Sequence, residues 1–350
     1  MNVLRYPENP LIKTRDVKPS REDFKVVGAF NAGVTKFGDE TVMLIRVAEM
    51  PKQEDPHAVL VPLLEETDDG NELVIKKIPK TEPGFDFSDP RVINHEGKTI
   101  YLTSISHLRL ARSRDGRHFE IDTTPTVFPE NKYEAWGIED CRITSMDEGY
   151  FITYSAVSDM GIAVGLIFTR DFSTFQRKGL ILPPENKDVM IFPEKINGRY
   201  YLLHRPVPGG IGEKEMWIAA SPDLRHWGDH KYLMGLREEY WDSQKIGGGA
   251  VPFRTDDGWV AIYHGVDENE RYCMGAVLLD LEDPTKVIAR SERPMLIPEA
   301  DYEADGFFGN VVFSCGVIVE DDVVKMYYGA ADEMMACAEI SIADIFASFA

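Results

Sequence analysis

The chain alternates short apolar runs with turn dipeptides, and this pattern repeats along most of its length. Four acidic-Gly or Asn-Gly dipeptides, at 96–97, 148–149, 197–198 and 257–258, are each followed by a run rich in aromatic and aliphatic residues. Glycine supplies the positive φ that a tight hairpin turn requires, so each dipeptide predicts a β-hairpin. Helical periodicity is confined to residues 342–349, where a short amphipathic helix is expected. The pattern therefore predicts an all-β fold with a short C-terminal helix.

A polar or glycine-rich motif precedes each hairpin, and the resulting unit recurs roughly every 50 to 60 residues, a spacing typical of β-propeller blades. Six units can be counted, although closure of the ring by the chain ends would reduce the number of blades to five. Strands that carry such motifs line the channel of a propeller, so the polar side chains are expected to meet at one mouth. The motifs are Asn31–Gly33, Ser88–Arg91, Glu139–Arg142, Phe192–Lys195, Gly247–Ala250 and Gly309–Asn310.

Composition narrows the class of protein. The 350 residues include 38 Lys and Arg against 59 Asp and Glu, which gives a formal charge of −21. This balance argues against nucleic-acid or anionic-membrane partners, because both require a basic face. Hydrophobic residues make up 43% of the chain, enough for a substantial core, and a single domain over residues 1–350 is expected. No apolar run is long enough for a signal sequence or a membrane span, so a cytoplasmic location is expected.

The cysteines predict neither a disulfide framework nor a metal site. Four of them are scattered along the chain without a Cys-x-x-Cys pair, a pattern typical of free buried thiols in a reducing compartment. They are Cys141, Cys273, Cys315 and Cys337.

The sharpest local motif is the acidic pair Glu139-Asp140 followed by Arg142. Adjacent residues on a strand point to opposite faces, so Asp140 is expected to share a face with Arg142 and not with Glu139. An arginine at that distance would orient the carboxylate, and we predict that Asp140 is a proton donor with Arg142 in the substrate-binding set. The structural alternative is a stabilising salt bridge, repeated at Asp89 and Arg91.

A local excess of basic residues follows that motif, which is unusual in so acidic a chain. It predicts an anion site, because arginine makes planar bidentate contacts and lysine provides a point charge. Lys178 and Arg199 are expected to be solvated turn residues, and His204 could be a buried core residue. Hydrolysis by two carboxylates, Asp140 with Glu194 or Asp89, also remains open. The basic residues are Arg177, Lys178, Lys187, Lys195, Arg199, His204 and Arg205.

Nine motifs occur in a fixed order along the chain: Phe30–Val34, Leu44–Val47, Ser88–Arg91, Gly137–Ile143, Asn186–Asp188, Phe192–Ile196, Leu203–Pro206, Tyr263–Gly265 and Tyr327–Asp332. Taken together, they resemble glycoside hydrolase family 130, the β-mannoside phosphorylases, from about Asn9 to the C-terminus. The resemblance implies a five-bladed propeller and inverting phosphorolysis, in which a β-mannoside and phosphate give α-mannose 1-phosphate and a free sugar. Inorganic phosphate is then a co-substrate, no other cofactor or metal is implied, and a homo-oligomer is expected because family members commonly assemble.

The resemblance also implies roles for single residues. Asp140 matches the proton donor of the family, which is thought to act through the 3-hydroxyl of the sugar. The implied phosphate-binding residues are Arg177, Lys187, His204 and Tyr263. The implied sugar-binding residues are Asn31, Arg46, Asp89, Arg91 and Asp332.

Two departures from the family pattern leave alternatives open. Cys141 stands where many members have proline, and residues 159–161 lack an arginine that some phosphorylases direct at phosphate. A hydrolase on the same fold is therefore an alternative, and a non-catalytic sugar-binding propeller is a less favoured one. The N-terminal motif Tyr6–Leu11 favours the branch that acts on β-1,2-linked mannobiose or short mannooligosaccharides, with β-1,4-linked mannosides as the nearest competitor.

Overall fold

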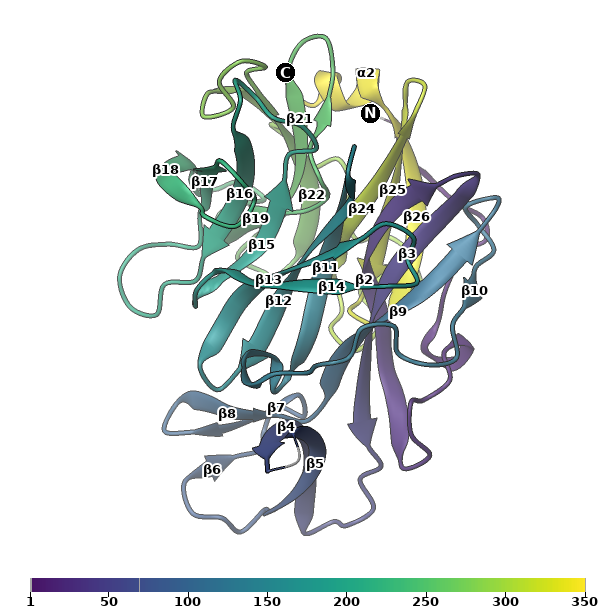
Figure 1. The fold of residues 1–350 in the computed structure, drawn as a ribbon, viewed down its shortest axis with the longest axis vertical. Helices are drawn as coiled ribbons and strands as arrows, with labels where there is room; N and C mark the ends of the chain where they lie inside the picture. The colour runs from purple at the N-terminus through teal and green to yellow at the C-terminus, as the bar shows by residue number, and fades with distance from the viewer. Residues whose placement is uncertain (1, 69, 350) are drawn as a thin grey trace.

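The computed structural model describes residues 2–68 and 70–349, and almost every regular element in them is a β-strand (Figure 1). The predicted C-terminal helix is confirmed as α2 (Ile342–Ala347), whose first turn is capped by Ser341 through a hydrogen bond from the Asp344 backbone N–H to Oγ, at 3.0 Å. The other helical elements described are short: α1 (Asp301–Ala304) and the 3-10 turns η1 (Thr14–Asp16) and η2 (Lys132–Glu134). The predicted all-β class is confirmed.

Antiparallel strands form groups of four, and the first two groups join into one sheet through a parallel bridge between Gly137 and Ser106. The first group is β2 (Phe24–Phe37), β3 (Glu40–Pro51), β9 (Ile105–Ser113) and β10 (Glu120–Ile121). The second is β11 (Gly137–Met146), β12 (Gly149–Ser158), β13 (Gly161–Thr169) and β14 (Gln176–Leu182).

Two further groups follow in chain order. One is β15 (Asn186–Ile191), β16 (Tyr200–Pro206), β17 (Met216–Ser221) and β18 (Gly228–Met234). The next is β19 (Lys245–Gly248), β21 (Trp259–Val266), β22 (Tyr272–Leu279) and β23 (Val287–Arg290), with β20 (Phe253–Arg254) beside β21.

The last group joins the two ends of the chain. It consists of β24 (Val312–Glu320), β25 (Val323–Ala330), β26 (Met334–Ser341) and the N-terminal β1 (Leu4–Arg5). Leu4 pairs with Glu339 and Arg5 with Ala338, so the first strand completes a sheet made by the last three. The N-terminus accordingly lies beside α2 (Figure 1).

An insertion between β3 and β9 forms a separate small lobe, at the bottom of the view in Figure 1. It contains the hairpin β4 (Ala58–Thr67) and β5 (Gly70–Pro79) and a sheet of β6 (Phe85–Asp86), β7 (Val92–His95) and β8 (Lys98–Leu102). The turn at 96–97 does form a hairpin, between β7 and β8. Its motif Ser88–Arg91, however, belongs to this three-stranded sheet and not to a four-stranded group. The unit counted there from the sequence is therefore an insertion.

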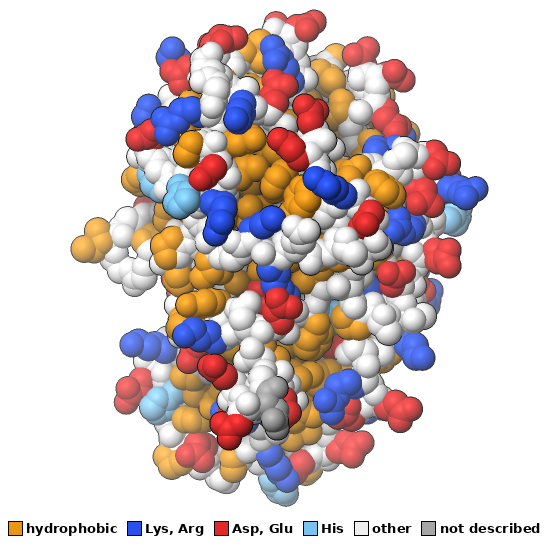
Figure 2. Space-filling model, viewed as in Figure 1, with side chains coloured by type: hydrophobic (Ala, Val, Ile, Leu, Met, Phe, Trp, Pro, Cys, Tyr) orange, Lys and Arg blue, Asp and Glu red, His pale blue; other side chains and the backbone are white. Residues whose placement is uncertain are grey.

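Neighbouring groups pack through their apolar faces. Between the groups of β15–β18 and β19–β23, Trp259 is buried edge-on against Phe192, with ring centroids 5.3 Å apart. The four cysteines are free and buried, as predicted. Among the described residues no helix is both long and apolar enough to cross a membrane. Basic side chains on the face in Figure 2 lie among acidic ones instead of forming a continuous basic surface.

Candidate functional site

Three strands share one irregularity, and it directs a polar side chain from each strand at the same cavity. The antiparallel register shifts in β2 at Asn31, in β11 at Asp140 and in β15 at Asp188. These residues have φ of 48°, 46° and 58°, values that Asn and Asp adopt more readily than most other residues. A bulge bends its strand and changes the direction of the side chain. All three residues consequently line a cavity of about 140 Å³.

The bulge in β11 overturns the prediction that Glu139 and Asp140 face apart. Arg46 contacts both, since its Nη2 donates to Glu139 Oε1 at 2.6 Å and its Nη1 donates to Asp140 Oδ1 at 3.0 Å. Simple strand alternation fails here because Asp140 occupies the extra position of the bulge.

Arg142 lies beneath the cavity and does not line it. Its fully buried guanidinium donates to the carbonyl oxygens of Asp140 (2.8 Å), Gly248 (2.8 Å) and Gly249 (3.0 Å). The side chain therefore ties the bulge of β11 to the glycine-rich strand β19. Its contacts are those of a positioning residue and not of the substrate-binding residue predicted from the sequence.

Asp140 is held as a carboxylate in the free site. Its Oδ1 accepts hydrogen bonds from Asn31 Nδ2 at 3.0 Å and from Arg46. Burial by itself would raise the pKa of Asp140, but the charges of Arg46, Lys187 and Arg142 outweigh burial and lower it. A change in the charge of the cavity would therefore change the protonation of this group.

Cations are in excess at one end of the cavity. Lys187, Arg205 and Lys245 line it, whereas Asp188 is the carboxylate at that end. Arg205 donates to Asp188 Oδ2 through Nε at 2.9 Å and Nη2 at 2.8 Å, which leaves the two lysines in surplus. An anion bound here would be stabilised by charge-assisted hydrogen bonds.

The other polar groups at this end respond to the same charges. Lys245 Nζ donates to the hydroxyl of Tyr272, and burial together with Arg205, Lys187 and Lys214 lowers the pKa of Lys245 to about 8. Burial also lowers the pKa of His264 to about 3 despite the nearby Asp188, so this imidazole is neutral. Lys245 is thus the group at this end of the cavity whose charge changes near pH 8.

A second cavity of about 240 Å³ adjoins the first, and Arg46 and Asp332 line both. Arg91, Glu139 and aromatic side chains complete its walls. Burial, assisted by Asp140 and Glu139 and opposed by Arg46 and Arg91, raises the pKa of Asp332 to about 6. The two cavities therefore meet at a cluster of carboxylates around Arg46.

The structure brings together part of the predicted set. Asp140, Asn31, Arg46, Lys187 and Asp332 line the first cavity. Arg91 lines only the second cavity. It forms an ion pair with Asp89, 2.7 Å between Arg91 Nη2 and Asp89 Oδ2, and Asp89 lines neither cavity.

Arg177 is not brought to the cavity. It lies on β14, the outer strand of its group, where Nη1 donates to Glu134 Oε1 at 2.5 Å and Nη2 donates to the Phe128 carbonyl at 2.7 Å. Glu130 forms a second ion pair with the same guanidinium. The sequence reasoning placed this arginine with the phosphate ligands, but two carboxylates already neutralise it.

His204 and Tyr263 also lie outside the cavity. His204 Nδ1 is 2.7 Å from Asn186 Oδ1, and burial with His230 lowers its pKa to about 3. The Tyr263 hydroxyl donates to Asp242 at 2.8 Å and accepts from Arg290 at 2.9 Å.

The next residue along each of these strands does line the cavity. Arg205 follows His204, and His264 follows Tyr263. Because adjacent strand residues face opposite sides, an error of one position exchanges a core residue for a cavity residue. Arg205 belongs to the basic stretch predicted from the sequence, whereas His264, Asp188, Lys245 and Tyr272 were missed, although Asp188 stands inside a motif that was recognised.

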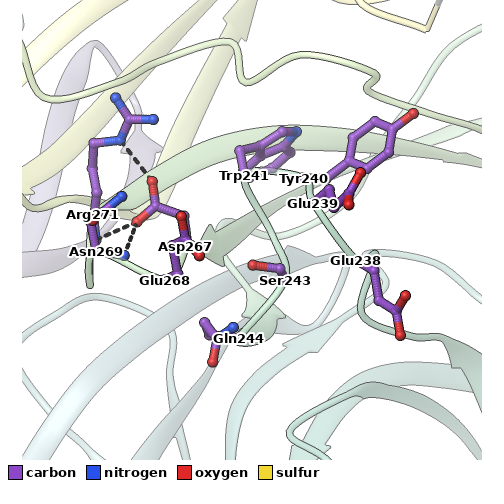
Figure 3. Close-up of a pocket in the computed structure, with 10 residues that line it drawn as sticks. All are labelled: Glu238, Glu239, Tyr240, Trp241, Ser243, Gln244, Asp267, Glu268, Asn269 and Arg271. Carbon is purple, nitrogen blue, oxygen red and sulfur yellow. Dashed lines mark hydrogen bonds and ion pairs between the residues drawn. The ribbon is translucent and has the colours of Figure 1, made fainter.

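A larger surface cavity of about 490 Å³ has the opposite character (Figure 3). Glu238, Glu239, Asp267 and Glu268 contribute carboxylates to it, and its Arg271 is paired with Asp267, 3.1 Å from Nε to Oδ2. An anion is therefore disfavoured there, and the cavity beside Asp140 is the better candidate for chemistry.

The fold and this site define an all-β protein with a buried carboxyl in a cavity that also holds several basic side chains, and comparisons with known proteins identify its family. A model of glycoside hydrolase family 130, described as β-1,4-mannooligosaccharide phosphorylase, matches residues 99–349. The chain is 50% identical to a β-1,2-mannobiose phosphorylase of Listeria innocua, over 99% of this chain and 98% of that protein. It is 43% identical to a 1,2-β-oligomannan phosphorylase of a Thermoanaerobacter species, over 70% of this chain and 82% of that protein.

A solved structure agrees with these matches. The Listeria innocua β-1,2-mannobiose phosphorylase, solved with β-1,2-mannobiose, superposes with a TM-score of 0.96 at 49% identity and covers 100% of this chain and 99% of that one. The chain belongs to glycoside hydrolase family 130.

Proposed function

We propose that this protein is an inverting phosphorylase that converts β-1,2-mannobiose or short β-1,2-mannooligosaccharides and phosphate into α-mannose 1-phosphate and the shortened sugar. The observation that carries the proposal is the position of Asp140, a buried carboxyl in a cavity that Lys187, Arg205 and Lys245 also line. The activities named for the Listeria innocua and Thermoanaerobacter relatives support the β-1,2 linkage.

In the proposed reaction, a phosphate oxygen held at the cationic end attacks the anomeric carbon and the glycosidic bond breaks on the opposite face. The departing oxygen takes a proton from Asp140, relayed through the 3-hydroxyl of the sugar as the family resemblance implies. The proton of monohydrogen phosphate returns to Asp140, so the protons balance over one turnover. No further cofactor takes part in this proposal.

The charges in the site support a role for Asp140 as the proton donor once phosphate is bound. The pKa of Asp140 is lowered in the free site partly by Lys187 and Arg142. A phosphate dianion beside Lys187 would offset these charges and raise the pKa of Asp140. Phosphate binding would therefore help to protonate the acid that the reaction needs.

Hydrolysis is less well supported, because an attacking water requires a carboxylate base. At the cationic end Asp188 is bonded twice to Arg205, and Arg205, His264 and Lys187 hold its pKa far below the usual range despite its burial. The partners considered from the sequence lie elsewhere: Glu194 forms an ion pair with Arg254, 2.7 Å apart, and Asp89 pairs with Arg91.

We further propose that the four-stranded groups are the five blades of a β-propeller, that residues 1–350 form one catalytic domain, and that the protein acts as a cytoplasmic homo-oligomer. The pairing of β1 with β26 supports the first point, since it closes the last group with the first strand. One of the six units counted from the sequence, at Ser88–Arg91, lies in the insertion, which also favours five.

Incubation with β-1,2-mannobiose, with and without phosphate, tests the function. We expect mannose 1-phosphate to form only with phosphate, and β-1,4-mannobiose to be a poor substrate. Asp140→Asn serves as the negative control, because it keeps the volume and tolerates positive φ while removing the proton, at a cost of about 10²- to 10⁴-fold in rate. Equal release of free mannose without phosphate would instead identify a hydrolase.

A further inference from the structure

Two histidines outside the reaction cavity direct ring nitrogens at each other. His230 Nδ1 lies 3.1 Å from His204 Nε2, and the two rings are inclined at 78° with their centroids 5.1 Å apart. His204 comes from β16, and His230 comes from β18, the outer strand of the same four-stranded group (Figure 1). The proposed reaction gives neither ring a role.

Hydrogen bonds fix the position of the proton on His204. The Asn186 amide donates through Nδ2 to the Pro183 carbonyl at 3.3 Å, which turns its Oδ1 toward His204. That oxygen can only accept, so His204 Nδ1, 2.7 Å away, donates to it. The His204 ring is 4% exposed, and burial disfavours a charged imidazole. Its Nε2 therefore has no proton and presents a lone pair to His230.

The same arrangement is typical of histidines that bind metal ions. A ligating imidazole usually donates its other N–H to a carbonyl or carboxylate oxygen, which fixes the tautomer and directs the ligating nitrogen. Asn186 provides such an acceptor for His204. Two nitrogens that bind one tetrahedral zinc ion lie about 3.3 Å apart, because each Zn–N bond is about 2.0–2.1 Å long. The separation of 3.1 Å between the two rings is close to this value.

We propose that His204 Nε2 and His230 Nδ1 together bind one divalent ion of the zinc class. Imidazole suits Zn²⁺, Ni²⁺ and Cu²⁺, whereas Mg²⁺ and Ca²⁺ prefer oxygen ligands. Within residues 2–68 and 70–349, no group of three or more His, Cys, Asp or Glu side chains is placed to hold a metal. Water therefore completes the coordination, and the ion exchanges with solvent.

The exposed ring of His230 provides the entry path, because an exposed side chain rotates freely enough to admit an ion. Without metal, His230 Nδ1 carries the proton that is shared with His204. Metal binding at this nitrogen moves that proton to His230 Nε2, so the ring stays neutral and no proton is released overall.

The site also lies next to the residues of the cationic cavity. Arg205 follows His204 and Lys187 follows Asn186, and both cations line that cavity. An ion that joins β16 to β18 would stabilise the group of strands that carries these two cations. This inference does not depend on the proposed function.

Calorimetric titration of the protein, without a histidine tag, with zinc chloride tests the proposal. We expect one ion per chain and a Tm that rises with the zinc concentration, because the ion binds the folded state. Magnesium chloride should produce neither effect. His230→Asn, a change in an exposed side chain, and His204→Asn should each weaken zinc binding by at least about tenfold. Asn186→Ala removes only the acceptor for His204 Nδ1 and should weaken binding by about tenfold.

His226→Asn is the matched control. His226 lies between β17 and β18, its side chain is 80% exposed, and its Nδ1 is 2.7 Å from Asp223 Oδ2. This variant should bind zinc as the unsubstituted protein does, and a loss of binding in it alone would overturn the proposal by placing the ion at that pair. Absence of zinc binding, or unchanged affinity in both His230→Asn and His204→Asn, would also overturn it and leave a hydrogen bond between two neutral rings.

Discussion

Two clusters of charge, one around Arg177 and one around Arg205, come from the same basic stretch of the sequence but have opposite charge balances. Arg177 forms ion pairs with the carboxylates of Glu130 and Glu134. Arg205 forms an ion pair with Asp188, and Lys187 and Lys245 line the same cavity. The carboxylates around Arg177 match its charge, whereas the cations around Arg205 outnumber the carboxylate there, so we expect the first cluster to stabilise the fold and the second to favour an anion.

Arg177→Met should have the largest effect on stability and none on phosphate binding. The Glu134 side chain is 1% exposed and would keep only the Tyr154 hydroxyl, at 2.6 Å, as its strong side-chain partner. Breaking a buried ion pair in this way costs about 3–5 kcal/mol in the free energy of unfolding. Urea unfolding measures this loss, and assays below the transition should give an unchanged KM for phosphate.

Arg199→Met is the control for that experiment. Arg199 forms an ion pair with Asp229 whose side chains are 45% and 60% exposed, so solvent screening should keep the loss under about 1 kcal/mol. Wild-type stability combined with a raised KM for phosphate in Arg177→Met would show that the comparison between the two clusters is wrong.

Lys187→Met should weaken the use of phosphate while leaving stability nearly unchanged, the reverse of Arg177→Met. It removes one surplus cation from the cavity, and a hydrogen bond to a charged group contributes about 1.5–3 kcal/mol, so kcat/KM for phosphate should fall by roughly 10- to 100-fold. The unfolding free energy should change little, because Asp188 keeps its bonds to Arg205. Lys178→Met, in a half-buried residue outside the cavity that contacts Gln176, should leave kcat/KM unchanged. A large loss of stability with normal kinetics in Lys187→Met would assign Lys187 to the fold.

The sequence predicted the local secondary structure better than the direction in which each side chain points. Hairpin turns depend on adjacent residues, so all four were found, and the motif around Asp140 indicated a residue that does line the cavity. The partners of a side chain depend on distant segments: Glu134 meets Arg177 across 43 positions. Nothing in the local pattern shows that pairing.

Errors of one position and a bulge account for much of the rest. His204 and Tyr263 were predicted at the site, whereas their neighbours Arg205 and His264 line the cavity, although Tyr263 lies in a strand with a regular register. The extra position in β11 likewise brought Glu139 and Asp140 to one arginine. A positive φ at Asn31, Asp140 and Asp188 marks the bulged positions. Asn and Asp are also common in turns, so the residue type alone does not distinguish a bulge from a turn.

The pH dependence of phosphate binding sharpens the comparison further. Burial and its basic neighbours lower the pKa of Lys245 to about 8, so this lysine is charged below that pH and neutral above it. The KM for phosphate should therefore rise as the pH passes through about 8. Lys245→Arg should remove this rise, because arginine stays protonated, and the ratio of the two profiles cancels the titration of phosphate itself. Identical profiles for both proteins would mean that the charge of Lys245 does not contribute to binding.

The smallest effect is expected for His204→Asn, a change beside the cavity that should leave phosphate kinetics unaltered. The pKa of His204 is lowered to about 3 by burial and by His230, so the ring is neutral at the pH of any assay and supplies no charge. Its ring contacts Asn186 and His230, and the loss of one neutral hydrogen bond costs about 0.5–1.5 kcal/mol in the free energy of unfolding. His264→Gln is the informative partner, because His264 faces the cavity one residue beyond Tyr263 and contacts Asp188 at 3.8 Å. A raised KM for phosphate in His264→Gln but not in His204→Asn would place the anion in the cavity, since both rings are neutral and only His264 lines it.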